Sequence, residues 1–106
     1  MMIKSVNPAT GAEIRSYALL TPEQLDSRLA LAWTAYLEVR RRPMHERAGW
    51  VSAVADILEK EKRELGRLMT EEMGKPIGAA IAEAEKCALA CRYYAENAER
   101  LLGQID

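Results

Sequence analysis

The sequence predicts a mainly α-helical chain in which a short N-terminal β-hairpin precedes three or four helices packed as an irregular bundle. Apolar residues recur at intervals of three and four between residues 25 and 102, which is the period of an amphipathic helix. Residues 2–20 lack this period and surround a strong turn signal, Asn7-Pro8-Ala9-Thr10-Gly11. The length of 106 residues suits a single domain.

The first element expected is the hairpin, formed by two short strands within residues 2–20. Its apolar residues are Ile3, Val6, Ile14, Tyr17 and Leu19. A lone two-stranded hairpin is only marginally stable in water, so we expect it to lie on another part of the protein.

The next element expected is a helix over residues 22–41. Thr21 is a good N-cap, Pro22 suits the first helical position, and Gln24 completes a capping box. We expect the helix to end before Pro43, because a residue that precedes proline avoids the helical region. Its apolar stripe consists of Leu25, Leu29, Ala32, Trp33 and Tyr36.

Helical patterns over residues 44–61 and 62–73 predict either two helices or one long helix. The charged segment EKEKRE between them is read as a solvated face or a break. Gly74 is placed to end the helix at its C′ position, with a positive φ. The buried stripe expected on the first part consists of Trp50, Val51, Val54, Ile57 and Leu58.

The last and longest helix is expected over residues 76–102, opened by Pro76. Its apolar residues follow a heptad-like seam with mostly small side chains, so we expect a neighbouring element to approach closely. The seam consists of Ile77, Ile81, Ala84, Ala88, Cys91, Ala95, Ala98 and Leu102. So much apolar surface predicts a large partner surface, either another copy of this chain or another part of a larger protein.

The charge balance argues against several classes of partner. A net charge of -1 does not favour capture of nucleic acid or of an anionic membrane, and Arg40-Arg41-Arg42 reads as a solvated helix end. No apolar run approaches a membrane span, and residues 1–7 do not resemble a secretory signal. Two cysteines four residues apart on one helix are poorly placed for a disulfide, so a cytoplasmic location is expected.

Candidate chemical groups are few, and each has a simpler structural interpretation. Cys87 and Cys91 could be a redox pair, metal ligands or a nucleophile, but cysteines in an alanine-rich seam are more often packing residues. His45 has no second ligand at metal-binding spacing and reads as a surface or capping residue. The sequence therefore assigns no catalytic, cofactor-binding or metal-binding residue.

Two further patterns resemble functional motifs only superficially. Glu71 and Glu72 are adjacent, so on a helix they diverge by about 100° and do not face each other. The segment Gly74-Lys75-Pro76-Ile77-Gly78 lacks the spacing of a phosphate-binding loop and follows a helix, which favours a helix-to-helix turn.

Five motifs, in order, resemble the opening part of the aldehyde dehydrogenase family and cover almost all of residues 3–101. The combination is most similar to the succinate-semialdehyde dehydrogenase branch. The motifs are Asn7-Pro8-Ala9-Thr10-Gly11, Glu46-Arg47-Ala48, Leu68 to Pro76, Glu85-Lys86-Cys87-Ala88, and Cys91-Arg92-Tyr93-Tyr94-Ala95.

The resemblance implies an enzyme that oxidises an aldehyde to an acid with NAD or NADP. In that family a cysteine thiolate attacks the carbonyl, a hydride passes to the nicotinamide, and a carboxylate activates the hydrolytic water. The family's reactive residues and its glycine motif lie beyond the equivalent of Asp106. Neither Cys87 nor Cys91 matches the position of the nucleophile.

Residues 1–106 are therefore expected to be the N-terminal helical segment of such an enzyme. They would form part of its α/β nucleotide-binding domain, contain no complete catalytic or cofactor-binding domain, and be inactive alone. The alternative is a stand-alone helical module for self-association or protein interaction. Either way, the helix over residues 76–102 is the expected contact surface. The aldehyde and the choice between NAD and NADP stay open.

Overall fold

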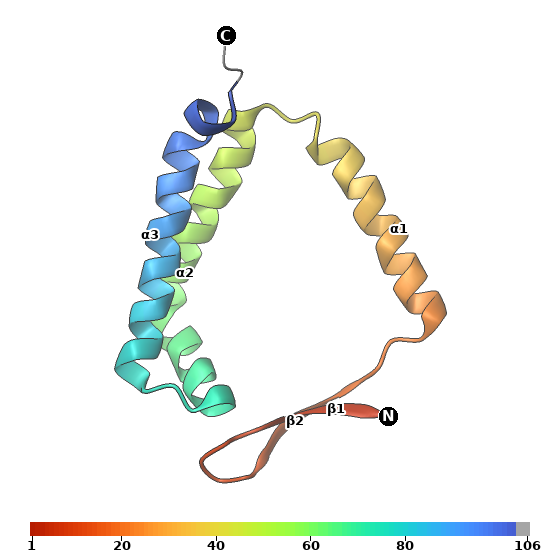
Figure 1. The fold of residues 1–106 in the computed structure, drawn as a ribbon, viewed down its shortest axis with the longest axis vertical. Helices are drawn as coiled ribbons and strands as arrows, with labels where there is room; N and C mark the ends of the chain where they lie inside the picture. The colour runs from red at the N-terminus through yellow and green to blue at the C-terminus, as the bar shows by residue number, and fades with distance from the viewer. Residues whose placement is uncertain (104–106) are drawn as a thin grey trace.

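The computed structural model describes residues 1–103. These residues form a two-stranded hairpin followed by three helices (Figure 1). The prediction of a mainly helical chain with an N-terminal hairpin is thus confirmed. The elements are β1 (Met2–Val6), β2 (Glu13–Ala18), α1 (Pro22–Val39), α2 (Met44–Met73) and α3 (Ile77–Leu102).

The hairpin is closed by the predicted turn. β1 and β2 are antiparallel, with Met2 opposite Ala18 and a register irregularity between Ser5 and Val6. In the turn, Asn7 Oδ1 accepts a hydrogen bond from the Ala9 backbone N–H at 2.9 Å. Gly11 has a φ of 73°, a left-handed conformation that glycine adopts without steric cost.

Helix α1 begins as its sequence requires. The Thr21 hydroxyl accepts a hydrogen bond from the Gln24 backbone N–H at 3.2 Å, and the Gln24 side chain accepts one from the Thr21 backbone N–H at 3.0 Å. This reciprocal capping box satisfies two donors at the helix start. The helix ends at Val39, two residues earlier than expected, and residues 40–42 continue as a turn.

Helix α2 is one continuous helix of 30 residues, so the two expected helices are merged. Ion pairs within the charged segment support this continuity: Lys62 contacts Glu59 at 2.6 Å, and Arg67 contacts Glu64 at 2.6 Å. Pairs at this spacing stabilise a helix. Gly74 ends α2 as predicted, with a φ of 75° and its N–H donating to the Thr70 carbonyl.

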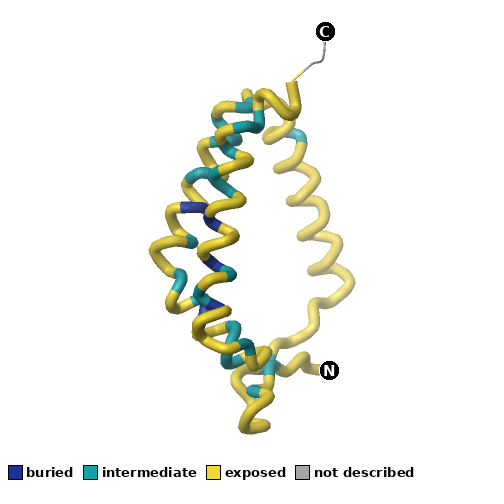
Figure 2. Tube along the Cα trace, turned by 60° about the vertical axis from the view of Figure 1, so that its left-hand side comes forward, coloured by how far each residue is buried: buried dark blue, intermediate teal, exposed yellow. Residues whose placement is uncertain are grey.

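Helices α2 and α3 form an antiparallel hairpin joined by the short turn at residues 74–76 (Figure 1). The buried residues of the described chain all lie along the contact between them (Figure 2). They are small, which lets the two helix backbones approach closely. These residues are Ala55, Gly66, Ala80, Ala84 and Ala88.

Two ion pairs connect α2 to α3 across this contact. Lys62 Nζ lies 2.8 Å from Glu85 Oε1, and Arg92 Nη1 lies 2.8 Å from Asp56 Oδ1. Both pairs join positions in the same antiparallel register. They therefore favour one alignment of the two helices, although exposed pairs add little to stability.

Helix α1 stands apart from the α2–α3 hairpin (Figure 1). No residue of α1 is buried, whereas several residues along the α2–α3 contact are buried (Figure 2). We expected all helices to pack in one irregular bundle, but among the described residues only α2 and α3 pack extensively against each other. The radius of gyration, 18.3 Å, exceeds the value of about 13 Å typical of a compact chain of this length. The chain thus has an open arrangement, in which α1 is separated from the α2–α3 hairpin.

Candidate functional site

An apolar groove among the described residues lies where the end of α1 meets α2 and α3. Its volume is about 430 Å³. The lining is almost wholly apolar, and Arg47 is the charged residue in it. The residues that line it are Val39, Met44, Arg47, Ala48, Trp50, Val51, Val54, Tyr94, Ala95, Ala98 and Leu102.

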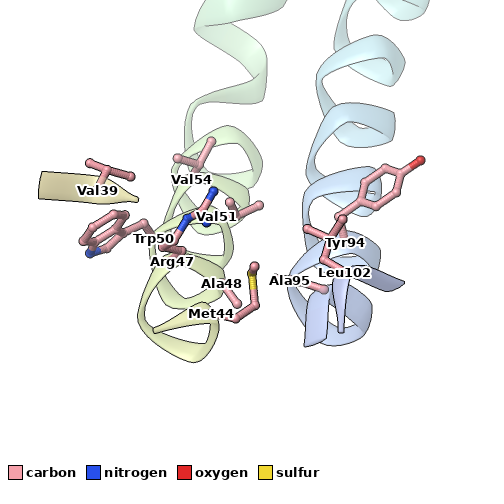
Figure 3. A pocket seen from close by; sticks show the side chains of 11 residues that line it. Val39, Met44, Arg47, Ala48, Trp50, Val51, Val54, Tyr94, Ala95 and Leu102 are labelled. Atoms are coloured by element: carbon pink, nitrogen blue, oxygen red, sulfur yellow. The ribbon is translucent and has the colours of Figure 1, made fainter. Parts of the chain in front are cut away.

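Each helix contributes to the groove at a definite place. Val39 is the last residue of α1 and lies beside Trp50 of α2 (Figure 3). Met44, the first residue of α2, lies between α2 and α3 (Figure 3). The Tyr94 side chain extends outward from α3, with its hydroxyl directed away from α2 (Figure 3). A groove with this lining presents an apolar surface and holds no group placed for catalysis.

The apolar stripe expected to be buried on α2 is largely exposed within this chain, so that expectation is corrected. Trp50 is 47% exposed and Ile57 is 53% exposed. The stripe does lie on one face of a helix, as predicted, but α3 covers a different face of α2. The stripe thus faces away from the chain's own core and lacks a covering element among the described residues.

The seam on α3 is buried at its centre, in contrast to the exposed stripe of α2. Ala84 and Ala88 are buried and Ile81 is half-buried, because α2 already packs against them. The centre of the seam is thus occupied within the chain. The expectation that this seam faces a partner outside the chain is therefore corrected at its centre, which packs on α2, while exposed apolar side chains remain at its flanks and ends. Residues there with exposed side chains are Ile77, Leu89, Tyr93, Tyr94, Leu101 and Leu102.

The two cysteines are free and occupy different environments. Cys91 is half-buried on the side of α3 that faces α2, but Cys87 is exposed. The interpretation of both as buried packing residues is therefore wrong for Cys87. It lies beside the seam, at the edge that α2 does not reach.

The remaining candidates are dispersed over the surface. His45 is exposed in the first turn of α2, as expected for a surface residue. Glu71 pairs with Arg67 at 2.6 Å. Arg42 pairs with Glu46 at 3.5 Å, which neutralises part of the basic cluster. The structure brings none of these groups together.

The segment Gly74-Lys75-Pro76-Ile77-Gly78 is a helix-to-helix turn, as the sequence indicated. The Thr70 hydroxyl lies 2.7 Å from the Lys75 carbonyl and 3.1 Å from the Gly66 carbonyl, which ties the turn to α2. Pro76 is the N-cap of α3 and makes no side-chain capping bond. The turn lacks the glycine spacing of a dinucleotide-binding loop and follows a helix, and residues 1–103 offer no other glycine-rich loop.

Surface ion pairs shift several pKa values in residues 1–103. Hydrogen bonds from Lys4 and Ser16 lower the pKa of Glu13. A hydrogen bond from Arg67, followed by its charge, lowers the pKa of Glu64. Hydrogen bonds to Glu59 and Glu85 raise the pKa of Lys62. Each shift stabilises the charged form, so these groups serve as ionic contacts and not as proton donors or acceptors near neutral pH.

Two kinds of site are absent from residues 1–103. No cluster of three or more His, Cys, Asp or Glu side chains is placed to hold a metal ion. No helix in this part of the chain combines the length and apolarity needed to cross a membrane.

Sequence reasoning missed the part that Met44 and Tyr94 play in the groove. Glu46-Arg47-Ala48 and the tyrosine pair were read as motifs of separate helices, and periodicity along one helix does not show which residues meet across two. The antiparallel register of α2 and α3 places both residues in the lining of one groove. The apolar residues at the start of the helix predicted over residues 44–61 and at the end of the helix predicted over residues 76–102 are the signal that could have indicated this groove.

Comparisons with known proteins extend over the whole chain. A family model described as the aldehyde dehydrogenase family matches residues 1–106. Over 102 residues the chain is 44% identical to succinate-semialdehyde dehydrogenase [NADP(+)] 1 of Mycobacterium tuberculosis. That match covers 96% of this chain but 22% of the relative. The chain thus spans about a fifth of the length of the curated relatives that it matches, and it corresponds to their N-terminal part.

Solved structures share the arrangement of the helices as well. One is an NADP-dependent glyceraldehyde-3-phosphate dehydrogenase from Bacillus halodurans, complexed with NADP. It has a TM-score of 0.88 and 34% identity, over 95% of this chain and 21% of that one. Another is a succinic semialdehyde dehydrogenase from Streptococcus pyogenes in complex with NADP+. It has a TM-score of 0.87 and 28% identity, over 93% of this chain and 22% of that one.

Proposed function

The chain belongs to the aldehyde dehydrogenase family, and from that premise we propose that it serves as the N-terminal helical segment of an NADP-dependent succinate-semialdehyde dehydrogenase. The observation that carries the proposal is the 44% identity to such an enzyme over 96% of the chain. The names of several relatives specify NADP, which supports NADP over NAD. A cytoplasmic location stays part of this proposal.

In this enzyme the role of residues 1–106 is structural. The described residues hold no nucleotide cradle and no reactive constellation, so we place the nucleophile, the base and the cofactor site in the sequence that follows. What this segment supplies is a rigid α2–α3 hairpin and a separate amphipathic helix, each with an apolar face toward that following part.

The separation of α1 from the α2–α3 hairpin supports this role. The high TM-scores mean that α1 stands away from α2–α3 in the relatives too, although this segment is about a fifth of each of them. An isolated helix is only marginally stable and normally gains most of its stability from packing, yet no residue of α1 is buried within this chain. The rest of the enzyme is therefore the natural source of the surface that covers α1 and the exposed stripe of α2.

An activity assay of two proteins tests the proposal. The first is the 106-residue chain alone, which we expect to give no NADP reduction with succinate semialdehyde. The second is a chimera in which this chain replaces the aligned segment of the Mycobacterium tuberculosis relative. We expect the chimera to be active, with a kcat/KM within about tenfold of that relative, because the segment supplies packing and no reacting group.

Two results would contradict the proposal. Steady NADP reduction by the 106-residue chain would show that it carries its own catalytic groups. A chimera that folds but has no activity would show that this segment does not replace the aligned part of a succinate-semialdehyde dehydrogenase. A chimera carrying an inserted charge, Trp50→Glu, is the matched comparison, and we expect it to assemble poorly.

A further inference from the structure

Two turns that are far apart in the sequence lie together in the fold. The turn of the β-hairpin, residues 7–12, lies beside the turn between α2 and α3 (Figure 1). Pro8 Cγ is 3.2 Å from the point where a Cβ on Gly74 would stand, so the Pro8 ring lies against the open side of Gly74. Asn7 and Lys75, the neighbours of these two residues, are half-buried although both lie in turns. The two turns therefore cover each other in part.

The hairpin turn holds the Pro8 ring in a defined place. The Asn7 N–H donates to the Ala12 carbonyl at 2.9 Å, and the Gly11 N–H donates to the Asn7 carbonyl at 2.8 Å. The side chain of Asn7 accepts a further hydrogen bond from the Ala9 N–H at 2.9 Å. These bonds close the turn on both sides of Pro8, and the proline ring fixes its own φ. The ring is thus presented by a turn that is already ordered.

The turn that receives the ring is ordered as well. The Gly74 N–H donates to the Thr70 carbonyl at 3.0 Å, and the Thr70 hydroxyl lies 2.7 Å from the Lys75 carbonyl. Gly74 has a φ of 75° and no side chain, which leaves room for the Pro8 ring. Because each turn is ordered by its own hydrogen bonds, their contact costs little additional conformational entropy.

The position of α1 depends on its two ends, because no residue of the helix is buried. At the C-terminal end, the N–H groups of Arg41 and Arg42 donate to carbonyls of the last turn of α1, and α2 begins at Met44. At the N-terminal end, only residues 19–21 separate β2 from α1. Whatever holds the β-hairpin in place therefore also holds the start of α1.

We propose that the contact between Pro8 and Gly74 is a latch, which fastens the β-hairpin to the α2–α3 turn and thereby fixes the start of α1. Without the latch, the β-hairpin and α1 would move together about residues 40–43. Gly74 then meets two separate requirements, a left-handed backbone that ends α2 and an open side that receives Pro8. The latch is a property of this chain by itself and goes beyond the proposed enzyme role.

A distance measurement by pulsed electron paramagnetic resonance on the full 106-residue chain tests the latch. One spin label is attached to the native Cys87, which is exposed on α3, and the other to Ala12→Cys in the hairpin turn. Cys91→Ala leaves these two thiols as the labelled pair. We expect a single narrow distance distribution, because the latch keeps the hairpin turn at a fixed separation from α3.

Gly74→Asn separates the two requirements on Gly74. Asparagine adopts the left-handed conformation more readily than most residues, so α2 can still end there. Its Cβ, however, would stand 3.2 Å from the Pro8 ring. We expect the distance distribution to widen by roughly twofold or more. Gly78→Asn is the matched control and should leave the width unchanged, because a Cβ there meets no atom within 4 Å. Far-UV circular dichroism verifies that both variants stay helical.

Pro8→Ala removes the ring from the other side of the latch and leaves the end of α2 unaltered. We expect this variant to widen the distribution to a similar extent. Combined with Gly74→Asn it should add little, because both substitutions break the same contact.

Several outcomes would overturn the proposal. A parent distribution as broad as that of the variants would show that the hairpin is not held. Equal widths for Gly74→Asn and Gly78→Asn, or no change with Pro8→Ala, would show that this contact does not hold it. Independent effects in the double variant would show that Pro8 and Gly74 act separately. Failure here would leave the proposed dehydrogenase role untouched, because that role is tested by the activity of the chimera.

Discussion

Gly66 of α2 lies so close to Ile81 of α3 that no side chain fits between the two helices. A Cβ added to Gly66 would lie 2.7 Å from Ile81 Cγ1 and 3.1 Å from the Ile81 backbone nitrogen. Because a backbone atom is among the neighbours, rotation of the Ile81 side chain cannot relieve the contact fully. The close approach of α2 and α3 therefore depends on glycine at this position.

We predict that Gly66→Ala destabilises the α2–α3 hairpin. Overpacking typically costs about 1–3 kcal/mol, and alanine's better helix propensity returns about 1 kcal/mol. The expected net loss is up to about 2 kcal/mol in the free energy of unfolding. Urea unfolding followed by circular dichroism measures it. Gly49→Ala is the matched control in α2, where an added Cβ meets no atom within 4 Å. If both variants stabilise the chain equally, the close contact is absent.

The turn between α2 and α3 gives a second prediction. Gly74 has a φ of 75°, a conformation that costs a residue with a Cβ about 1–2 kcal/mol. We expect Gly74→Ala to lower the thermal unfolding midpoint. Gly78→Ala should not, because Gly78 lies in the first turn of α3 with open space around it. Equal midpoints for the two variants would argue against the left-handed cap.

Lys62 gives a prediction at high pH. Hydrogen bonds to Glu59 and Glu85 raise the pKa of Lys62 above its ordinary value, so the ion pair contributes fully below the pKa of an unfolded lysine. The contribution is lost as pH rises through the raised pKa. We expect Lys62→Met to be less stable than the parent chain at neutral pH, and the difference to shrink in strongly alkaline solution. A difference that stays constant with pH would show that the loss comes from packing alone.

Glu64 gives the opposite dependence at low pH. The hydrogen bond from Arg67 lowers the pKa of Glu64, so its contribution is present above the pKa of an unfolded glutamate. The contribution disappears as pH falls through the lowered pKa. We expect Glu64→Gln to reduce the helix content measured by circular dichroism at neutral pH, with no difference in acid. Salt should weaken the effect, because this pair is exposed.

Local features of the sequence predicted most of the secondary structure. The Thr21–Gln24 capping box, the Asn7–Gly11 turn and the Gly74 helix end are each determined by neighbouring residues, and the structure contains all three. The merging of the two middle helices depended on whether Lys62 and Arg67 would pair with glutamates one turn away. Periodicity cannot decide that.

The surfaces were harder to predict than the elements. Periodicity showed that Trp50 and Ala88 each lie on an apolar face, but it does not show which face another element covers. The structure buries Ala88 on α2 and leaves Trp50 exposed. The sequence also could not show that α1 stands apart, because its apolar stripe looks the same whether the partner is in this chain or outside it.

We propose that the apolar faces of this chain are completed by the part of a dehydrogenase that follows it. The most direct test co-expresses the chain with the remainder of the Mycobacterium tuberculosis relative, starting after the aligned segment. The rate of NADP reduction with succinate semialdehyde is then measured. We predict activity from the co-expressed pair, none from either part alone, and a large loss with Trp50→Glu. Equal activity from the remainder alone, or activity from the 106-residue chain alone, would contradict the claim.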